Sequence, residues 1–155
     1  MTLYQLVRRF DGEKEIPGQE HNPLIVAFHY MGGSPWFEDD ETPWCSSVMC
    51  ASAGYILGLC TPERAKARAR EWLNVGVHID LDDCVRGNDI IILSRGINAP
   101  GPEVIVAPGH VGVYHDHNED WIWMWGGNQN NEFNLSKYPR NRYLGARRLY
   151  QVEEV

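Results

Sequence analysis

Hydrophobic and polar residues alternate with helical spacing in the first half of the chain. Apolar residues at intervals of three and four predict an amphipathic helix over residues 3–10 (Leu3, Leu6, Val7 and Phe10). Three later segments begin with a polar residue followed by proline, which is typical of a helix N-cap and first helical position: Asn22-Pro23, Thr42-Pro43 and Thr61-Pro62. We expect helices over residues 23–31, 43–57 and 62–75, each ending before a glycine.

The pattern changes after residue 82, where short β-branched or aromatic runs are separated by Gly, Pro and Asn. Such runs predict strands, which we expect over residues 89–93, 104–106, 110–115, 121–125 and near 143–150. Helices followed by antiparallel strands indicate an α+β fold, with N-terminal helices packed on a C-terminal sheet. With no linker or repeat, residues 1–155 are expected to form a single domain.

Composition and charge narrow the classes of partner. The chain has a net charge of −7 with scattered basic residues, which argues against nucleic acid as the partner. Although 43% of its residues are hydrophobic, no continuous run of them is long enough to cross a bilayer, so we expect no membrane insertion. The N-terminus is amphipathic and does not resemble a signal peptide. We therefore expect the protein either to stay in the cytoplasm of a host bacterium until other proteins release it, or to be associated with a virion.

Cys45 is the strongest candidate for a nucleophile. It falls in the first turn of the helix expected over residues 43–57, where unpaired backbone N–H groups and the helix dipole stabilise a thiolate and lower the thiol pKa. Small residues follow it along this helix, so the backbone can lie close to a sheet. The four cysteines form no CxxC pair, which argues against a zinc site or a disulfide framework.

His110 is the candidate base, because it opens a predicted strand and Gly112 leaves room on the same face. A hairpin that turns near Asn118 and Glu119 places residue 128 opposite residue 110. Asn128 would then accept the imidazole N–H and fix the tautomer, so that the other ring nitrogen can exchange a proton with the thiol. Cys45, His110 and Asn128 are therefore predicted to form a catalytic triad.

Other polar and aromatic residues have weaker claims. Singly, a cysteine or histidine is more often structural, and the joint placement of Cys45 and His110 is what favours catalysis. We expect Trp44, Trp125 and Gln129 to line the substrate groove. The acidic residues Asp39, Asp40 and Glu41 offer oxygen ligands to calcium but lack the spacing and glycine of a dedicated loop, so no metal cofactor is expected. His115 and His117 fit a solvated hairpin tip better than a metal site.

A family resemblance follows from motifs in their order along the chain: Lys14-Glu15-Ile16-Pro17-Gly18, Asn22-Pro23, Glu41-Thr42-Pro43-Trp44-Cys45-Ser46, Gly109-His110-Val111-Gly112 and Gly126-Gly127-Asn128-Gln129. Over nearly its whole length the chain resembles small CHAP-like or NlpC-like cysteine peptidoglycan hydrolases of phages and prophages. The resemblance implies a papain-like fold, a Cys-His dyad with a third polar residue, no organic cofactor, and amidase or endopeptidase action on peptidoglycan. Cys45, His110 and Asn128 fall on the matching positions.

The chain also departs from the family pattern. Many CHAP domains carry Glu two residues before the Asn, where this chain has Gly126, and the segment from Ala99 to Pro102 is an insertion before the His110 strand. Two other functions are compatible with the same residues: a non-catalytic wall-binding module of a virion, and a toxin directed at rival bacteria. As a phage lysin, the protein would act with tail or lysis proteins.

Overall fold

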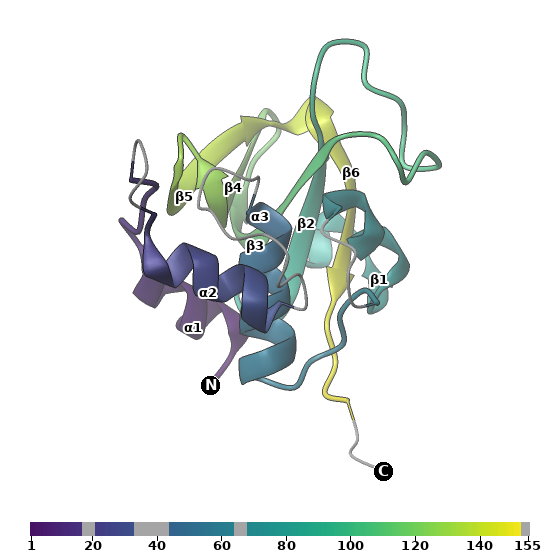
Figure 1. Ribbon diagram of the computed structural model, residues 1–155. Coiled ribbons are helices and arrows are strands. Elements are labelled where there is room, and N and C mark those ends of the chain that lie inside the picture. The colour runs from purple at the N-terminus through teal and green to yellow at the C-terminus, as the bar shows by residue number, and fades with distance from the viewer. Residues whose placement is uncertain (17–20, 33–43, 64–67, 153–155) are drawn as a thin grey trace.

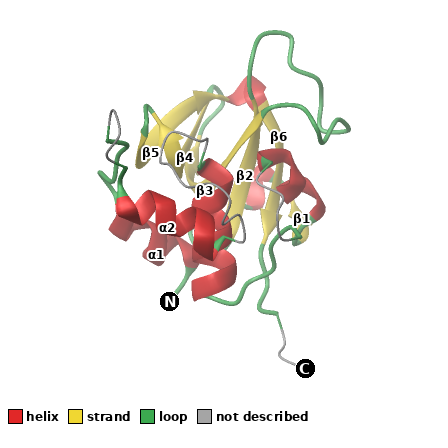
Figure 2. Ribbon diagram, in the orientation of Figure 1, coloured by secondary structure: helices red, strands yellow, loops and turns green. Residues whose placement is uncertain are grey.

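A six-stranded antiparallel sheet forms the centre of the molecule (Figures 1 and 2). The computed structural model describes residues 1–16, 21–32, 44–63 and 68–152. The strands are β1 (Val77–Ile79), β2 (Asp89–Ser94), β3 (Gly109–His117), β4 (Trp121–Gln129), β5 (Glu132–Pro139) and β6 (Tyr143–Arg148). Their order across the sheet is β1-β6-β2-β3-β4-β5, so that β3 lies at its middle between β2 and β4.

The helices of the N-terminal half pack against this sheet (Figure 1). They are α1 (Leu3–Val7), α2 (Pro23–Met31) and α3 (Cys45–Met49), with the π-helical turn η2 (Cys50–Ile56) continuing α3 and 3-10 helices at η1 (Arg8–Phe10) and η3 (Ala69–Asn74). Two further 3-10 helices, η4 (Leu81–Asp83) and η5 (Arg140–Arg142), connect strands of the second half of the chain. The main core joins helical residues such as Val48 and Trp72 to Ile90 and Ile92 of β2. The alternate residues of β2 enter a smaller second cluster.

The prediction for residues 23–31 is confirmed in full. The helix α2 begins at Pro23, and the Asn22 side chain accepts a hydrogen bond from the backbone N–H of Leu24 at 2.9 Å. The helix expected over residues 3–10 is present as α1 and η1. The start expected at Thr42-Pro43 lies outside the described residues, but residues 45–56 are helical as predicted.

The prediction of a helix from Pro62 to Val75 is wrong at its start. Residues 61–63 are not helical, and the helical turn of this region is η3 (Ala69–Asn74). The Thr61 hydroxyl donates to the carbonyl of Pro62 at 3.2 Å instead of accepting a hydrogen bond from a later backbone N–H. The side chain therefore does not act as the N-cap that the sequence predicts.

The strand expected over residues 104–106 is also absent, because an arginine takes up the backbone acceptors of this loop. Arg70 is fully buried, and its guanidinium donates to four carbonyls at 2.7–3.2 Å: Pro100, Gly101, Val104 and Pro108. The other predicted strands are present as β2, β3, β4 and β6. Two strands, β1 and β5, were not predicted from the sequence.

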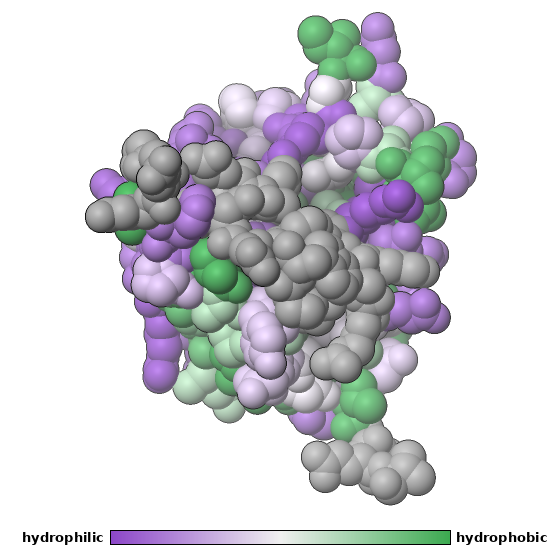
Figure 3. All heavy atoms as spheres, in the orientation of Figure 1, coloured by the Kyte–Doolittle hydropathy of each residue, from purple (hydrophilic) through white to green (hydrophobic). Residues whose placement is uncertain are grey.

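Two surface properties complete the description. Within the described residues, no helix is long and apolar enough to span a bilayer. On the face shown in Figure 3, hydrophilic and hydrophobic side chains are intermixed along the visible rim.

Candidate active site

Cys45 is the first residue of α3 and lines a small pocket beside the start of β3. Its side chain is buried, with 5% exposure. The pocket has a volume of about 240 Å³ and is lined by residues of four segments: Cys45; Arg68 and Ala69; Arg95; and Val106, Ala107, Pro108 and Gly109. The loop held by Arg70 therefore forms one wall of the Cys45 pocket.

His110 is the second residue of β3 and is fully buried. Its Nε2 atom lies 2.9 Å from Gln129 Oε1, at the end of β4, and 3.3 Å from the hydroxyl of Tyr138 on β5. Its Nδ1 atom lies 3.2 Å from a terminal guanidinium nitrogen of Arg95, in the segment after β2. Residues from the ends of two other strands and from one loop therefore fix the ring.

These partners determine the tautomer of His110. Gln129 Nε2 donates to the backbone and side-chain oxygens of Asn134, both at 2.8 Å, so the Gln129 atom that faces the ring is the amide oxygen. Because that oxygen only accepts, His110 Nε2 carries the proton, and because a guanidinium only donates, Nδ1 offers its lone pair to Arg95. The unprotonated nitrogen of the ring is therefore Nδ1.

Cys45 lies beside the backbone on both sides of His110. A backbone hydrogen bond from Val111, the residue after His110, reaches the Cys45 sulfur, and Gly109, the residue before it, lines the same pocket. The charge of Arg95 acts on both the thiol and the imidazole. The fold therefore brings the two predicted residues together around Arg95, although no hydrogen bond joins the thiol directly to the ring among the described contacts.

Burial governs the protonation of both groups. Burial raises the pKa of the Cys45 thiol, while the Arg95 guanidinium and the backbone N–H groups around the sulfur act in the opposite direction. Burial lowers the pKa of His110 to about 4, while the hydrogen bond that the ring donates to Gln129 acts in the opposite direction and the charges of Arg95 and Arg142 lower the pKa further. The lowered thiol pKa expected at a helix start is therefore wrong, and the thiol of Cys45 and the imidazole of His110 are both neutral near pH 7.

Gln129, rather than Asn128, is the residue that holds the imidazole. The predicted hairpin register is present, with Val113 opposite Trp125 and Tyr114 opposite Met124. The register between β4 and β5 then shifts between Gly126 and Gln129, and Asn128 has a φ of +58°. This bulge adds a residue to the strand, so the next side chain along takes the position predicted for Asn128.

The glycines before Gln129 make this arrangement sterically possible. A Cβ at Gly126 would lie 2.7 Å from Gln129 Oε1 and 3.2 Å from His110 Nε2, which gives a physical reason for Gly where CHAP domains often carry Glu. A Cβ at Gly127 would lie 2.5 Å from the Trp44 ring. Trp44 itself is fully buried and donates from Nε1 to Glu15 at 2.9 Å, so the prediction that it binds substrate is wrong.

The two other residues expected to bind substrate also have different surroundings. Gln129 is 3% exposed and positions His110 instead of facing the groove. Trp125 is 8% exposed, stacks on Phe133 with ring centroids 6.5 Å apart, and lines a hollow beside α1 rather than the Cys45 pocket. Both predictions are therefore corrected.

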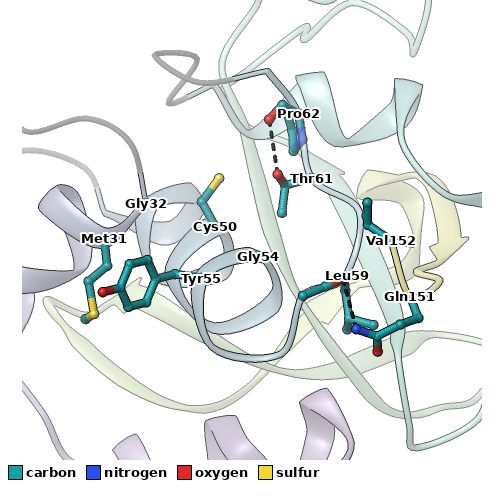
Figure 4. A pocket seen from close by; sticks show the side chains of 11 residues that line it. Met31, Gly32, Cys50, Gly54, Tyr55, Leu59, Thr61, Pro62, Gln151 and Val152 are labelled. Atoms are coloured by element: carbon teal, nitrogen blue, oxygen red, sulfur yellow. Dashed lines mark hydrogen bonds between the residues drawn. The ribbon is translucent and has the colours of Figure 1, made fainter. Parts of the chain in front are cut away.

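A larger pocket of about 510 Å³ lies beside η2 and the C-terminal segment, and Figure 4 shows its lining. Cys50 points into it, but burial raises the pKa of this thiol to about 12. None of its described lining residues is a histidine or a carboxylate. The described lining of this pocket therefore offers Cys50 no imidazole base and no carboxylic acid.

The structure does not test the weak candidates for calcium ligands that the sequence offers. Asp39, Asp40 and Glu41 lie outside the described residues. Among those described, no group of three or more His, Cys, Asp or Glu side chains is placed to hold a metal ion. His115 contacts the Tyr4 hydroxyl at 2.7 Å, and His117 lies between the Tyr114 hydroxyl and Asp82.

Sequence reasoning missed Arg95 and Tyr138. Arg95 follows β2 as a single basic residue before Gly96, and nothing in that pattern indicates its contact with His110. Tyr138 lies on β5, a strand that the sequence did not predict, and burial raises its pKa to about 12, so the hydroxyl stays protonated near pH 7. For Gln129 the pattern did hold an indication, since two consecutive glycines within a strand often mark a bulge.

Comparison with known proteins gives one informative likeness. No protein-family model matches the chain, and no curated protein matches it. The structure is similar to that of NlpC1 from Trichomonas vaginalis, with a TM-score of 0.51 and 17% sequence identity over 96% of this chain. The two proteins share a fold. This chain spans 44% of the length of the NlpC1 chain, and at this identity the likeness concerns the fold alone.

Proposed function

We propose that this protein is a cysteine amidohydrolase that cleaves an amide bond of peptidoglycan, with Cys45 as nucleophile, His110 as base and Gln129 as the residue that orients the base. The observation that carries the proposal is the fixed tautomer of His110. Its Nε2–H donates to Gln129, which leaves the Nδ1 lone pair at the side of the ring where Arg95 and the Cys45 pocket lie.

The first half of the reaction forms an acyl-enzyme. The Cys45 thiol gives its proton to His110 Nδ1, and the sulfur attacks the amide carbonyl carbon. The backbone N–H of Cys45 is the candidate donor to the oxyanion that forms. When this intermediate collapses, the C–N bond breaks, and the leaving amine takes the proton from His110. The Gln129 hydrogen bond stabilises the imidazolium while it exists.

The second half of the reaction regenerates the thiol. A water molecule gives a proton to His110 Nδ1 and attacks the thioester carbonyl, and the C–S bond then breaks. The proton returns from the imidazolium to the sulfur, and the acyl group leaves as a carboxylic acid. No redox partner or metal is needed for this balance.

Two observations support peptidoglycan as the substrate. The chain shares a fold with NlpC1, and it carries the ordered motifs around Cys45 and His110 that resemble those of CHAP-like and NlpC-like wall hydrolases. The finer assignment to a phage or prophage lysin, acting on the wall together with tail or lysis proteins, rests on those motifs alone and belongs to the same proposal.

The Cys45→Ala variant tests this function directly. We expect release of soluble fragments from purified cell walls to fall by roughly 10³-fold or more, because the covalent step has no nucleophile. The melting temperature should change little, because the substitution removes only one sulfur atom at the edge of a pocket. Fragment release is measured by mass spectrometry, which also identifies the bond that is cut.

The matched control is Cys50→Ala, which removes a thiol of the same helical segment that lines the other pocket. This variant should keep wild-type fragment release. Undiminished release by Cys45→Ala would refute the proposal. Wild-type protein that binds wall sacculi without releasing any fragment would instead favour a wall-binding module.

A further inference from the structure

Two arginines line the Cys45 pocket, in a protein whose net charge is −7. Arg95 is half-buried and Arg68 is exposed. The other described residues that line the pocket, apart from Cys45 itself, are small or apolar: Ala69, Val106, Ala107, Pro108 and Gly109. Among the described residues, the charged side chains that line the pocket around the nucleophile are therefore both cationic.

Neither arginine has a carboxylate partner within the described residues. The polar contact of Arg95 there is His110 Nδ1 at 3.2 Å, and that imidazole is neutral at pH 7 because burial lowers its pKa to about 4. Other arginines of the chain are arranged differently, since Arg148 makes two hydrogen bonds of 2.8 and 2.9 Å to the buried carboxylate of Asp89. A guanidinium forms its strongest hydrogen bonds with an anion, preferably with two oxygens at once.

We propose that Arg95 and Arg68 form a binding site for a carboxylate that the substrate carries next to its scissile amide. The substrate class is then a peptide with an acidic side chain or a free α-carboxylate beside the bond that is cut. The reference to a scissile amide rests on the proposed function, whereas the anion site itself does not. A pocket of about 240 Å³ has room for a carboxylate and the adjoining carbons next to the sulfur.

Carboxylate binding also affects the base. While Arg95 donates to His110 Nδ1, the lone pair of that nitrogen is occupied and cannot take the proton of Cys45. A carboxylate is a stronger acceptor than a neutral ring nitrogen, so it draws the guanidinium away and leaves Nδ1 available. An acidic substrate thereby prepares the base that cleaves it, and Arg95 acts as a positioning residue as well as a binding residue.

The test compares two alkylating reagents that differ in charge. The Cys45 sulfur displaces iodide from either reagent and forms a C–S bond; iodoacetate carries a carboxylate, and iodoacetamide is its neutral counterpart. The measured quantity is the ratio of the two alkylation rates at Cys45, resolved by peptide mass spectrometry and divided by the same ratio for free N-acetylcysteine. We expect this normalised ratio to be about five or more in the wild-type protein.

The variants assign the preference to the arginines. Arg95→Gln and Arg68→Gln should each lower the normalised ratio severalfold, and the double variant should bring it close to one. Arg9→Gln is the matched control, because it removes the same charge from an exposed residue that lines a different hollow beside Trp125. This control should keep the wild-type ratio.

Three outcomes would overturn the anion site. They are a wild-type ratio near one, a ratio that the Arg95 and Arg68 substitutions leave unchanged, and failure of both reagents to label Cys45. The proposed function fails separately. A protein that shows the charge preference but releases no wall fragment keeps the anion site and loses the hydrolase, whereas a protein that cleaves walls with a ratio near one keeps the hydrolase alone.

Discussion

Most of the chemistry proposed for this molecule depends on one buried imidazole, that of His110. Gln129 accepts from one nitrogen of His110 and Arg95 donates to the other, so each nitrogen has one defined role. Gln129 is in turn held by Asn134 on the neighbouring strand. The orientation of the base therefore depends on a chain of amide hydrogen bonds that starts at Gln129, one residue after the Asn128 that the sequence analysis predicted as the partner.

Substitutions at adjacent positions separate the two candidates for the third residue. We expect Gln129→Leu to lower kcat on cell wall roughly 10- to 100-fold with a smaller change in KM, because the imidazole loses its acceptor and its fixed tautomer. Asn128→Gly should keep activity and leave stability unchanged or raised by up to about 1 kcal/mol, since glycine accepts a positive φ without strain. Steady-state kinetics and urea unfolding measure both effects, and the reverse pattern would return the role to Asn128.

The buried state of His110 also predicts how stability depends on pH. In the unfolded chain this histidine takes up a proton near its ordinary pKa of 6.5, whereas in the folded protein it does so only at about 4. The unfolded state therefore binds more protons between these values, and the free energy of unfolding should fall as the pH is lowered from 6.5 to 4, by up to roughly 3 kcal/mol. Below pH 4 this contribution changes no further.

Urea unfolding at several pH values between 4 and 7.5 measures this slope. A His110→Gln variant lacks the titrating group, so its unfolding free energy should depend less steeply on pH in the same interval. An equal slope in the variant and the wild-type protein would assign the pH dependence to other groups.

At the level of elements, the bulge at the end of β4 is the decisive feature. It lies where the register with β5 shifts, and the glycines before Gln129 occupy spaces that a side chain would fill. The two glycines face different neighbours. Gly126 adjoins the His110–Gln129 hydrogen bond, and Gly127 adjoins the ring of Trp44.

Substitution by alanine at each of these glycines should therefore have a different effect on stability and activity. Gly127→Ala brings a methyl group to 2.5 Å from a fully buried indole, and we expect it to lower the unfolding free energy by about 1–3 kcal/mol. Gly126→Ala places its methyl group against Gln129 Oε1, and we expect a larger loss of activity than of stability. Thermal melts and wall-cleavage assays on both variants check this, and equal losses of stability would contradict it.

The sequence predicted those elements whose determinants are local. The cap at Asn22, the proline that follows it and the glycine at position 32 lie within one segment, and α2 has those bounds. The turn near Asn118 likewise set the pairing of β3 with β4. The proximity of Cys45 to the backbone around His110 followed from placing the first at a helix start and the second at a strand start.

The rest depended on contacts between residues distant in sequence. The loop at 104–106 has the residue types of a strand, but Arg70, 34 positions away, donates to the carbonyl of Val104. The place of Gln129 follows from pairing with β5, a strand that the sequence analysis did not predict although Glu132 to Ser136 alternate between polar and apolar residues. Arg95 reaches His110 through the fold, and no local pattern records that contact.

At the scale of the whole molecule, Arg70 joins the core to the wall of the candidate active site. It belongs to η3, where Trp72 enters the main core, and it holds the loop that lines the Cys45 pocket. We expect Arg70→Met to lower the unfolding free energy by roughly 3 kcal/mol or more, because four carbonyls lose their charged donor. Urea unfolding measures the loss, and a change below about 1 kcal/mol would show that water replaces the guanidinium at little cost.

The hydrogen bonds from the Arg70 side chain to four carbonyls determine how the loop at the Cys45 pocket can open. The loop cannot detach one residue at a time, because a residue whose carbonyl leaves first gains little conformational freedom while the other three carbonyls stay bonded to the guanidinium. Its amide hydrogens should therefore exchange with solvent together, in a single cooperative opening, rather than from the loop tip inwards. A bulky ligand that needs a wider entrance to the cysteine must then disturb the packing of the protein interior in order to enter.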